Sequence, residues 1–283
     1  MTDAADADHS SPGGVVEHYL AEQCSVITAA DAPLREGAGS VHDTRVAIRR
    51  LRSTLRVFAA VFEPIPAARL ERELSWYAGE LGAVRDREVL ALRLEDAVAA
   101  LPAGLVLGPV SAQIGEHLHD ELTYHRAALV RTMSGDRYRA LLSDVSGWRR
   151  QAPYTSLVDE RDGLLSLSSK AAAKARSRLA SAPDAADPAT ALHRARKAAK
   201  RARYSAELVE PLDPDQAGQR IRHFKHVQTE LGAYQDSVIA AELLRRLGAG
   251  AGTLPGHNGF TYGLLYQREV RAGQIARDTA LTL

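Results

Sequence analysis

The sequence predicts an all-α protein, and three observations support this fold class. Apolar residues make up 45% of the 283 residues, which is enough for a core, whereas aromatic residues make up only 5%. The core must therefore consist largely of Leu, Ala and Val, of which Leu and Ala favour helices. Runs of β-branched residues bounded by turn signals, which would indicate strands, are scarce.

Prolines and glycines divide the first half of the chain into helices, because a helix interior tolerates neither residue well. We expect five helices there, the last of them bent near Ser134 and Gly135: 15–33, 41–63, 67–84, 86–101 and 110–150. The breaks between them fall at GAGS (37–40), at Pro64 and Pro66, and at PAGLVLGP (102–109).

The second half follows the same scheme after an expected linker at 151–163. We expect its helices at 164–180, 189–210, 214–234, 236–247 and 259–281. The breaks are APDAADP (182–188), EPLDP (210–214) and GAGAGTLPGHNG (248–259). Residues 1–13 are polar and acidic and are expected to form a disordered tail.

The two halves repeat each other with a nearly constant shift of about 150 residues. Five positions of the first half, His42, Arg45, Arg49, Arg50 and Arg52, align with His193, Arg196, Lys200, Arg201 and Arg203. One helix later, ELGAVRD (80–86) aligns with ELGAYQD (230–236), and Arg72 aligns with Arg222. Two motifs repeated in the same order indicate a tandem duplication. We therefore expect two tandem four-helix-type bundles, 14–150 and 164–283, related by pseudo-two-fold symmetry.

The second motif contains a glycine and an aspartate with structural roles. Gly82 and Gly232 would allow a close helix approach or a tight turn. Asp86 and Asp236 are expected to cap the helix that follows, because an N-cap carboxylate accepts hydrogen bonds from free amides of the first turn.

The repeated helix combines a core face with a basic face. At 100° per residue, the apolar set Ile48, Leu51 and Leu55 lies beside a basic stripe of His42, Arg45, Arg49, Arg52 and Arg56. In the second half, His193, Arg196, Lys200 and Arg203 occupy the same angles. Glu207 stands where Arg56 would repeat, and Arg194, Lys197 and Arg201 form a second row.

Positive charge is concentrated on these helices, although the net charge is only +1. The 41–58 stretch holds five arginines and one acid, Asp43, and the 189–207 stretch is similarly basic with Glu207 as its acid. Like charges at i,i+4 destabilise a helix, so this segregation indicates an anionic partner. From His42 to Arg56 the stripe extends roughly 21 Å, which suits an extended anionic chain.

These motifs resemble those of the CHAD (conserved histidine α-helical domain) family. VHDTRVAIRRLRSTLRVF (41–58) and ALHRARKAAKRARYSAEL (191–208) both match its His-x-x-Arg-x-x-x-basic-basic-x-Arg pattern, and KHVQTELGAYQD (225–236) is similar to its second motif. The resemblance implies two helical bundles, four helices each by core definition, around a basic central surface or pore. It also implies binding of inorganic polyphosphate and, as in some members, association with polyphosphate granules.

The resemblance implies two tiers of polyphosphate-binding residues. The first tier is His42, Arg45, Arg49, Arg52, His193, Arg196, Lys200 and Arg203. The second tier is Arg50, Arg56, Arg72, Lys197, Arg201, Arg222 and Lys225. His42 and His193 have two possible roles: they donate a hydrogen bond to phosphate, or they form a capping or interhelical hydrogen bond.

Metal and nucleic-acid binding are the first two alternatives. His117, Glu121 and His125 share a helix face, but a di-iron bundle needs two Glu-x-x-His motifs and only one is found, so neither metal nor cofactor is expected. The basic stripes would attract any phosphodiester backbone, so non-specific nucleic-acid binding stays open. Specific reading is not expected, because the stripes lack Asn and Gln and have Tyr204 as their single aromatic.

An enzyme is the third alternative, and the sequence favours a binding module instead. It has no P-loop, Gly-x-Gly-x-x-Gly or Gly-x-Ser-x-Gly motif. Asp43 points away from the first stripe, where a carboxylate would be needed to hold Mg²⁺ for phosphoryl transfer. A lone Cys24, a polar amino terminus and the lack of a long apolar run predict a cytoplasmic protein without membrane segments.

Overall fold

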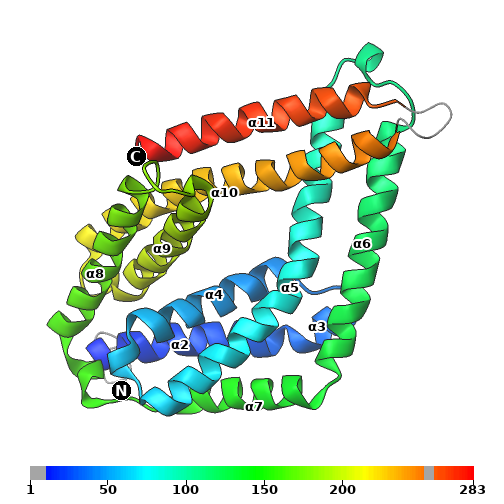
Figure 1. Cartoon of the computed structure of the whole chain (residues 1–283). Coiled ribbons are helices and arrows are strands. Elements are labelled where there is room, and N and C mark those ends of the chain that lie inside the picture. Colours follow the sequence, from blue (N-terminus) through cyan, green and yellow to red (C-terminus); the bar gives the residue numbers. More distant parts are fainter. Residues whose placement is uncertain (1–10, 252–257) are drawn as a thin grey trace. The chain divides into compact units, whose positions relative to one another are not determined.

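The computed structural model describes residues 11–251 and 258–283, and its regular elements in these ranges are helical (Figure 1). The only β pairing among the described residues is an isolated bridge between Phe62 and Tyr154. The all-α prediction is therefore confirmed. The α-helices are α2 (Pro12–Ala29), α3 (Asp31–Arg35), α4 (Val41–Val57), α5 (Pro64–Ala99), α6 (Val110–Met133), α7 (Asp136–Arg150), α8 (Arg161–Ala180), α9 (Pro188–Val209), α10 (Pro214–Ala251) and α11 (Phe260–Leu281). Three short 3-10 turns lie at Ala59–Val61, Ala103–Leu105 and Ser156–Asp159.

The chain forms two compact units, and each takes segments from both halves of the sequence. Unit 1 contains the described residues up to Gly82 together with Leu129–Gln228. Unit 2 contains Ala83–Ala128 and the described residues from Thr229 to Leu283. The sequence repeat divides the chain into 14–150 and 164–283, which are not the boundaries of the two units. The prediction that each half forms its own helical bundle stays a prediction.

Proline and side-chain caps explain where several helices begin. Pro12, Pro64, Pro188 and Pro214 each open a helix, where a missing amide proton costs nothing. Ser40 caps α4 by accepting from the amide of Asp43 at 3.1 Å, and Asp187 caps α9 by accepting from the amide of Thr190 at 3.1 Å. These caps fix the first turns of the two repeated helices.

Some expected boundaries differ from the structure. The expected bend near Gly135 is a complete break between α6 and α7, and the expected linker at 151–163 contains a 3-10 turn and the start of α8. Of the expected disordered tail, residues 1–10 lie outside the described residues, while Ser11 already caps α2 through the amide of Gly14 at 3.0 Å. The last expected break, 248–259, falls partly outside the described residues.

The expected breaks before Asp86 and Asp236 were wrong. Asp86 lies within α5 and Asp236 within α10, so neither residue caps a helix. The motifs before them contain one glycine and no proline, and a single interior glycine costs a helix only about 1 kcal/mol. The other role, close approach, is seen at Gly82: a methyl group there would lie 3.2 Å from Nη1 of Arg45 on α4.

The core of unit 1 is built from α2, α4, α7, α8 and α9. Helix α2 packs on α4 and α7, α8 packs on α9, and α4 packs on α9. The apolar side of α4 is fully buried, with Ile48 and Leu51 at 0% exposure. Half of the buried residues of α9 are alanines, including Ala198 and Ala202, and these small side chains let neighbouring helices approach closely.

Unit 2 has its own apolar core between the second part of α5, the first part of α6, the second part of α10, and α11. Leu94, Ile114, Leu244 and Leu265 are among its buried members. Arg93 on α5 also pairs with Glu269 on α11 at 2.7 Å. Within the described residues, no helix is both long and apolar enough to span a membrane.

Candidate functional site

All fifteen residues predicted to bind polyphosphate lie in unit 1. They come from α4, α9 and the parts of α5 and α10 that belong to this unit. The two repeated helices, α4 and α9, pack directly on each other, so residues of both can contribute to one site. The apolar stripe expected on α4 is buried and the basic stripe beside it is half-buried or exposed.

A first cationic pocket lies between α4 and α5. Arg45, Arg49 and Arg52 line it together with Ser75, Ala78 and Gly79, and its volume is about 270 Å³. Arg45 donates to the carbonyl of Leu81 at 3.4 Å, next to Gly82. The Nε atom of Arg49 is buried without a hydrogen-bond partner among the described residues. A buried donor without an acceptor is costly, so an anionic ligand here would relieve a penalty.

One carboxylate of α5 already pairs with the basic stripe of α4. Oε1 of Glu71 accepts from Nε and Nη2 of Arg52, both at 3.0 Å, and from Nε of Arg56 at 2.8 Å. Arg52 also donates to Ser75 at 2.8 Å. The stripe is therefore less positive than its own helix suggests, because the compensating acid comes from a neighbouring helix.

A second carboxylate, Glu207 of α9, joins the two repeated helices. It accepts from Nε of Arg50 on α4 at 2.9 Å and from Nε of Arg203 at 2.8 Å. The hydroxyl of Tyr19 on α2 lies 3.4 Å from the same carboxylate. Burial lowers the pKa of Arg50, but the charge and hydrogen bond of Glu207 outweigh it and raise the pKa overall. Arg50 and Arg203 thus belong to a structural ion-pair cluster.

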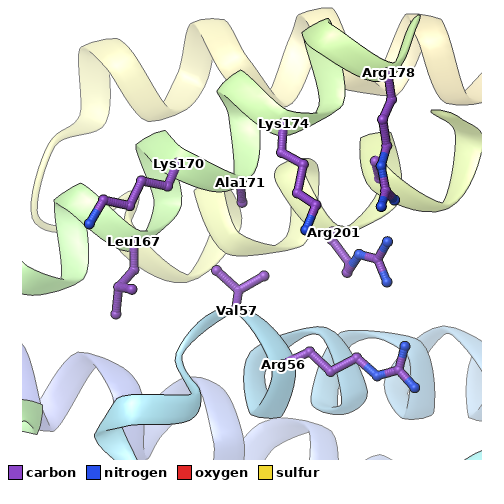
Figure 2. Close-up of a pocket in the computed structure, with 9 residues that line it drawn as sticks. Arg56, Val57, Leu167, Lys170, Ala171, Lys174, Arg178 and Arg201 are labelled. Atoms are coloured by element: carbon purple, nitrogen blue, oxygen red, sulfur yellow. The ribbon is translucent and has the colours of Figure 1, made fainter. Parts of the chain in front are cut away.

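A second cationic pocket, here called the Arg201 pocket, lies between α4, α8 and α9. Five basic residues line it together with Val57, Leu167, Ala171 and Ala198: Arg56, Lys170, Lys174, Arg178 and Arg201. Its volume is about 400 Å³. Figure 2 shows the guanidinium groups of Arg56 and Arg201 and the ammonium group of Lys174 approaching the same space from three helices.

The electrostatics of this pocket are those of an anion site. None of the nine residues that line it, all in the described part of the chain, is acidic. Burial lowers the pKa of Arg201, and the positive charges of Arg178, Arg56 and Arg52 lower it further. A charge held among like charges gains stability when an anion enters.

The comparison with known proteins decides the family. The model of the CHAD domain matches residues 18–245. The chain belongs to the CHAD family. Two Mycobacterium tuberculosis proteins, MT2285 of strain CDC 1551 and Rv2226 of strain H37Rv, are each 32% identical to it over 273 residues, which is 94% of this chain and 52% of theirs. This CHAD chain therefore spans about half the length of those relatives.

Two solved structures share the CHAD fold of this chain. PptA from Streptomyces chartreusis matches with a TM-score of 0.78 and 21% identity, over 96% of this chain and all of PptA. The CHAD domain from the plant Ricinus communis matches with a TM-score of 0.71 and 24% identity, over 96% of this chain and 92% of its own. At these identities the likeness shows the fold.

Several residues predicted from the sequence are not among those that line the two pockets. His42 is exposed at the start of α4, and His193 is half-buried on α9. Lys197, Arg222 and Lys225 are exposed, and Arg72 is exposed and lies 3.5 Å from Glu73. Arg196 and Lys200 are half-buried on α9. Neither pocket is lined by these residues.

The contribution of α8 to the Arg201 pocket was not predicted from the sequence. Lys170, Lys174 and Arg178 line the Arg201 pocket, yet none was predicted to bind. The signal was present, because these three residues recur at i, i+4 and i+8 within an expected helix and so share one face. It was overlooked because this helix lacks the family pattern.

The histidine cluster of α6 does not assemble a metal site in the described residues, where no three His, Cys, Asp or Glu converge suitably. His117 lies 3.9 Å from Glu121, and Glu121 pairs with Arg87 at 3.1 Å. The carboxylate is therefore engaged by a cation of α5.

Proposed function

We propose that this CHAD chain binds inorganic polyphosphate on unit 1 without cleaving it. The observation that carries the proposal is the Arg201 pocket, where five basic residues from three helices line one cavity without an acidic neighbour in the lining. Family membership supports the same ligand class, because CHAD proteins are associated with polyphosphate binding.

The two cationic pockets suit a chain of phosphates better than one compact anion. Arg52 lines the α4–α5 pocket, and Arg56 lines the Arg201 pocket one helical turn further along α4. Successive phosphates of one chain would meet both pockets along the same helix. Arg side chains suit such a ligand, because the planar guanidinium pairs with phosphate oxygens through two parallel hydrogen bonds.

Counterion release would drive much of the binding. Each phosphate neutralised by Lys or Arg releases condensed counterions, so affinity should fall steeply as salt rises. Binding without catalysis fits the pocket chemistry, since phosphoryl transfer usually needs carboxylates that hold Mg²⁺ beside the basic groups. A non-catalytic polyphosphate binder would localise to polyphosphate granules or help to organise them.

Calorimetric titration tests the proposal directly. The protein is titrated with long-chain polyphosphate, and separately with DNA at equal phosphate concentration, at three salt concentrations. We expect tighter binding of polyphosphate. Equal affinities would favour the alternative of non-specific nucleic-acid binding, and absence of binding at low salt would refute the proposal.

A double variant locates the site. Arg49→Ala with Arg201→Ala removes one cation from each pocket, and Arg149→Ala with Arg150→Ala removes the same charge from the exposed end of α7. We expect the first pair to weaken polyphosphate binding roughly a hundredfold and the control pair only slightly, because hydrogen bonds to charged groups contribute about 1.5–3 kcal/mol each. Equal effects would show that net charge alone governs binding. Release of short phosphates during incubation with Mg²⁺ would indicate an enzyme.

A further inference from the structure

The two repeated helices carry matching positions with opposite electrostatic environments. In the sequence repeat, Arg50 corresponds to Arg201 and Arg56 corresponds to Glu207. Glu207 of α9 faces Arg50 of α4 and forms an ion pair with it at 2.9 Å. At the corresponding place, Arg56 of α4 and Arg201 of α9 face the same cavity (Figure 2). One of the two related places holds an ion pair, and the other holds a pair of like charges.

The neighbouring helices strengthen this contrast. Beside the Arg50 place, α2 contributes Tyr19, whose hydroxyl lies 3.4 Å from Oε2 of Glu207. Beside the Arg201 place, α8 contributes Lys170, Lys174 and Arg178 to the cavity. At the Arg50 place, Arg50 and Tyr19 surround the carboxylate of Glu207. At the Arg201 place, the neighbouring groups are cations that would attract an external anion.

The pKa values of Arg50 and Arg201 shift in opposite directions at these two places. Burial lowers the pKa of Arg50, but the carboxylate of Glu207 more than reverses this effect. For Arg201, burial and then Arg178, Arg56 and Arg52 all lower the pKa. At the second place, Arg56 pairs with Glu71 at 2.7 Å, whereas Arg201 has no acidic partner among the described residues and so lacks the compensating anion that Arg50 receives from Glu207.

We propose that Glu207 is an internal substitute for the ligand: its carboxylate occupies the oxyanion position beside Arg50, which leaves the related Arg201 pocket as the one open to an external phosphate group. This inference rests on the proposed function, since it assigns the phosphate subsite and predicts that only one of the two related places accepts ligand. The carboxylate and a phosphate group share the oxygen acceptors that arginine recognises in parallel pairs.

Reversing the charge at Arg56 tests whether a carboxylate of the chain can take the place of a phosphate group. Arg56→Glu places a carboxylate opposite Arg201, as Glu207 lies opposite Arg50. It also removes the Arg56–Glu71 pair at 2.7 Å, while Arg52 still pairs with Glu71 at 3.0 Å. The probe is inorganic tripolyphosphate, measured by calorimetry at fixed salt. We expect Arg56→Glu to weaken tripolyphosphate binding at least tenfold while circular dichroism shows that helicity is retained. Arg150→Glu makes the same charge change on exposed α7 and should weaken binding less than twofold.

A second variant tests the other place. Glu207→Gln removes the internal charge while keeping its shape, and it should add one tripolyphosphate per chain relative to the wild type, with helicity checked by circular dichroism. Unchanged binding by Arg56→Glu, or unchanged stoichiometry in folded Glu207→Gln, would overturn the inference. Wild-type binding of long-chain polyphosphate but not tripolyphosphate would overturn it too, while leaving the proposed function intact. Failure of long-chain binding itself would instead refute the proposed function.

Discussion

The carboxylate of Glu207 on α9 accepts a hydrogen bond from Nε of Arg50 on α4 at 2.9 Å and so links the two repeated helices. The same carboxylate holds Arg203 at 2.8 Å. The Glu207 side chain is only 13% exposed, so this cluster is largely shielded from water. It ties together α4 and α9, the two helices whose other basic residues we propose to bind polyphosphate.

Removing Glu207 should destabilise unit 1. Glu207→Ala leaves Arg50 and Arg203 as half-buried like charges, and breaking a shielded pair costs about 2–3 kcal/mol. Urea unfolding followed by circular dichroism measures the loss. Glu210→Ala, at an exposed position just beyond the end of α9, is the control and should change the free energy of unfolding by less than about 0.5 kcal/mol. Equal effects of the two variants would contradict a structural role for the cluster.

Removing the charge of Arg201 should have the opposite effect on the unliganded protein. Arg201→Gln relieves repulsion from Arg178 and Arg56, and we expect the free energy of unfolding to rise by about 0.5 kcal/mol at low salt. The gain should shrink as salt screens the charges. Differential scanning calorimetry at two salt concentrations measures it. A thermal midpoint that falls at low salt would show that Arg201 has a stabilising partner.

Substitution of Gly82 should affect binding more than stability. A methyl group there would lie 3.2 Å from the guanidinium of Arg45, which must shift, while alanine gains about 1 kcal/mol of helix propensity. We expect Gly82→Ala to keep or raise the free energy of unfolding and to weaken polyphosphate binding roughly three- to tenfold. Gly147→Ala on α7, where the methyl group meets open space, should leave binding unchanged. Stronger binding by Gly82→Ala would contradict this role for the Arg45 position.

Gly273 allows α11 to pack closely on α10 in unit 2. A methyl group at Gly273 would collide with the side chain of Ser237, which is 2% exposed and donates to the carbonyl of Tyr234 at 2.8 Å. Gly273→Ala should therefore destabilise the protein by about 1–3 kcal/mol. Gly263→Ala on the same helix meets open space and should be neutral or slightly stabilising. Thermal unfolding of both variants distinguishes steric overlap from a general effect of alanine in α11.

Most of the fold follows from local chemistry that one sequence displays. The buried face of α4, with Ile48 and Leu51, was predicted from helical spacing, and most helix ends lie at prolines or glycines. The continuity of α5 and α10 was not predicted. An aspartate three or four residues after a glycine has the same local pattern whether it caps a helix or lies inside one. What decides is packing along the whole helix, which a local motif does not contain.

The candidate site was predicted only in part, because its charge balance arises between helices. Within the 41–58 stretch, the arginines have only Asp43 as a nearby acid, yet Glu71 and Glu207 reach them from α5 and α9. Likewise, Lys174 and Arg178 complete the Arg201 pocket from α8. Helical spacing places Lys174 and Arg178 on one face of their helix, but it does not show which other helix a charged face meets. An Arg-rich binding surface on the repeated helices stays a prediction, and the distribution of neutralised and unneutralised arginines became visible only in the tertiary contacts.

The Arg201 pocket contains ionisable groups of only two kinds, the guanidinium groups of three arginines and the ammonium groups of two lysines. The nine lining residues include no histidine, carboxylate or cysteine. A phosphate group, in contrast, gains its second charge near pH 6. If this pocket holds the end of the ligand, an affinity that rises between pH 5.5 and 7 would report ionisation of the terminal phosphate groups.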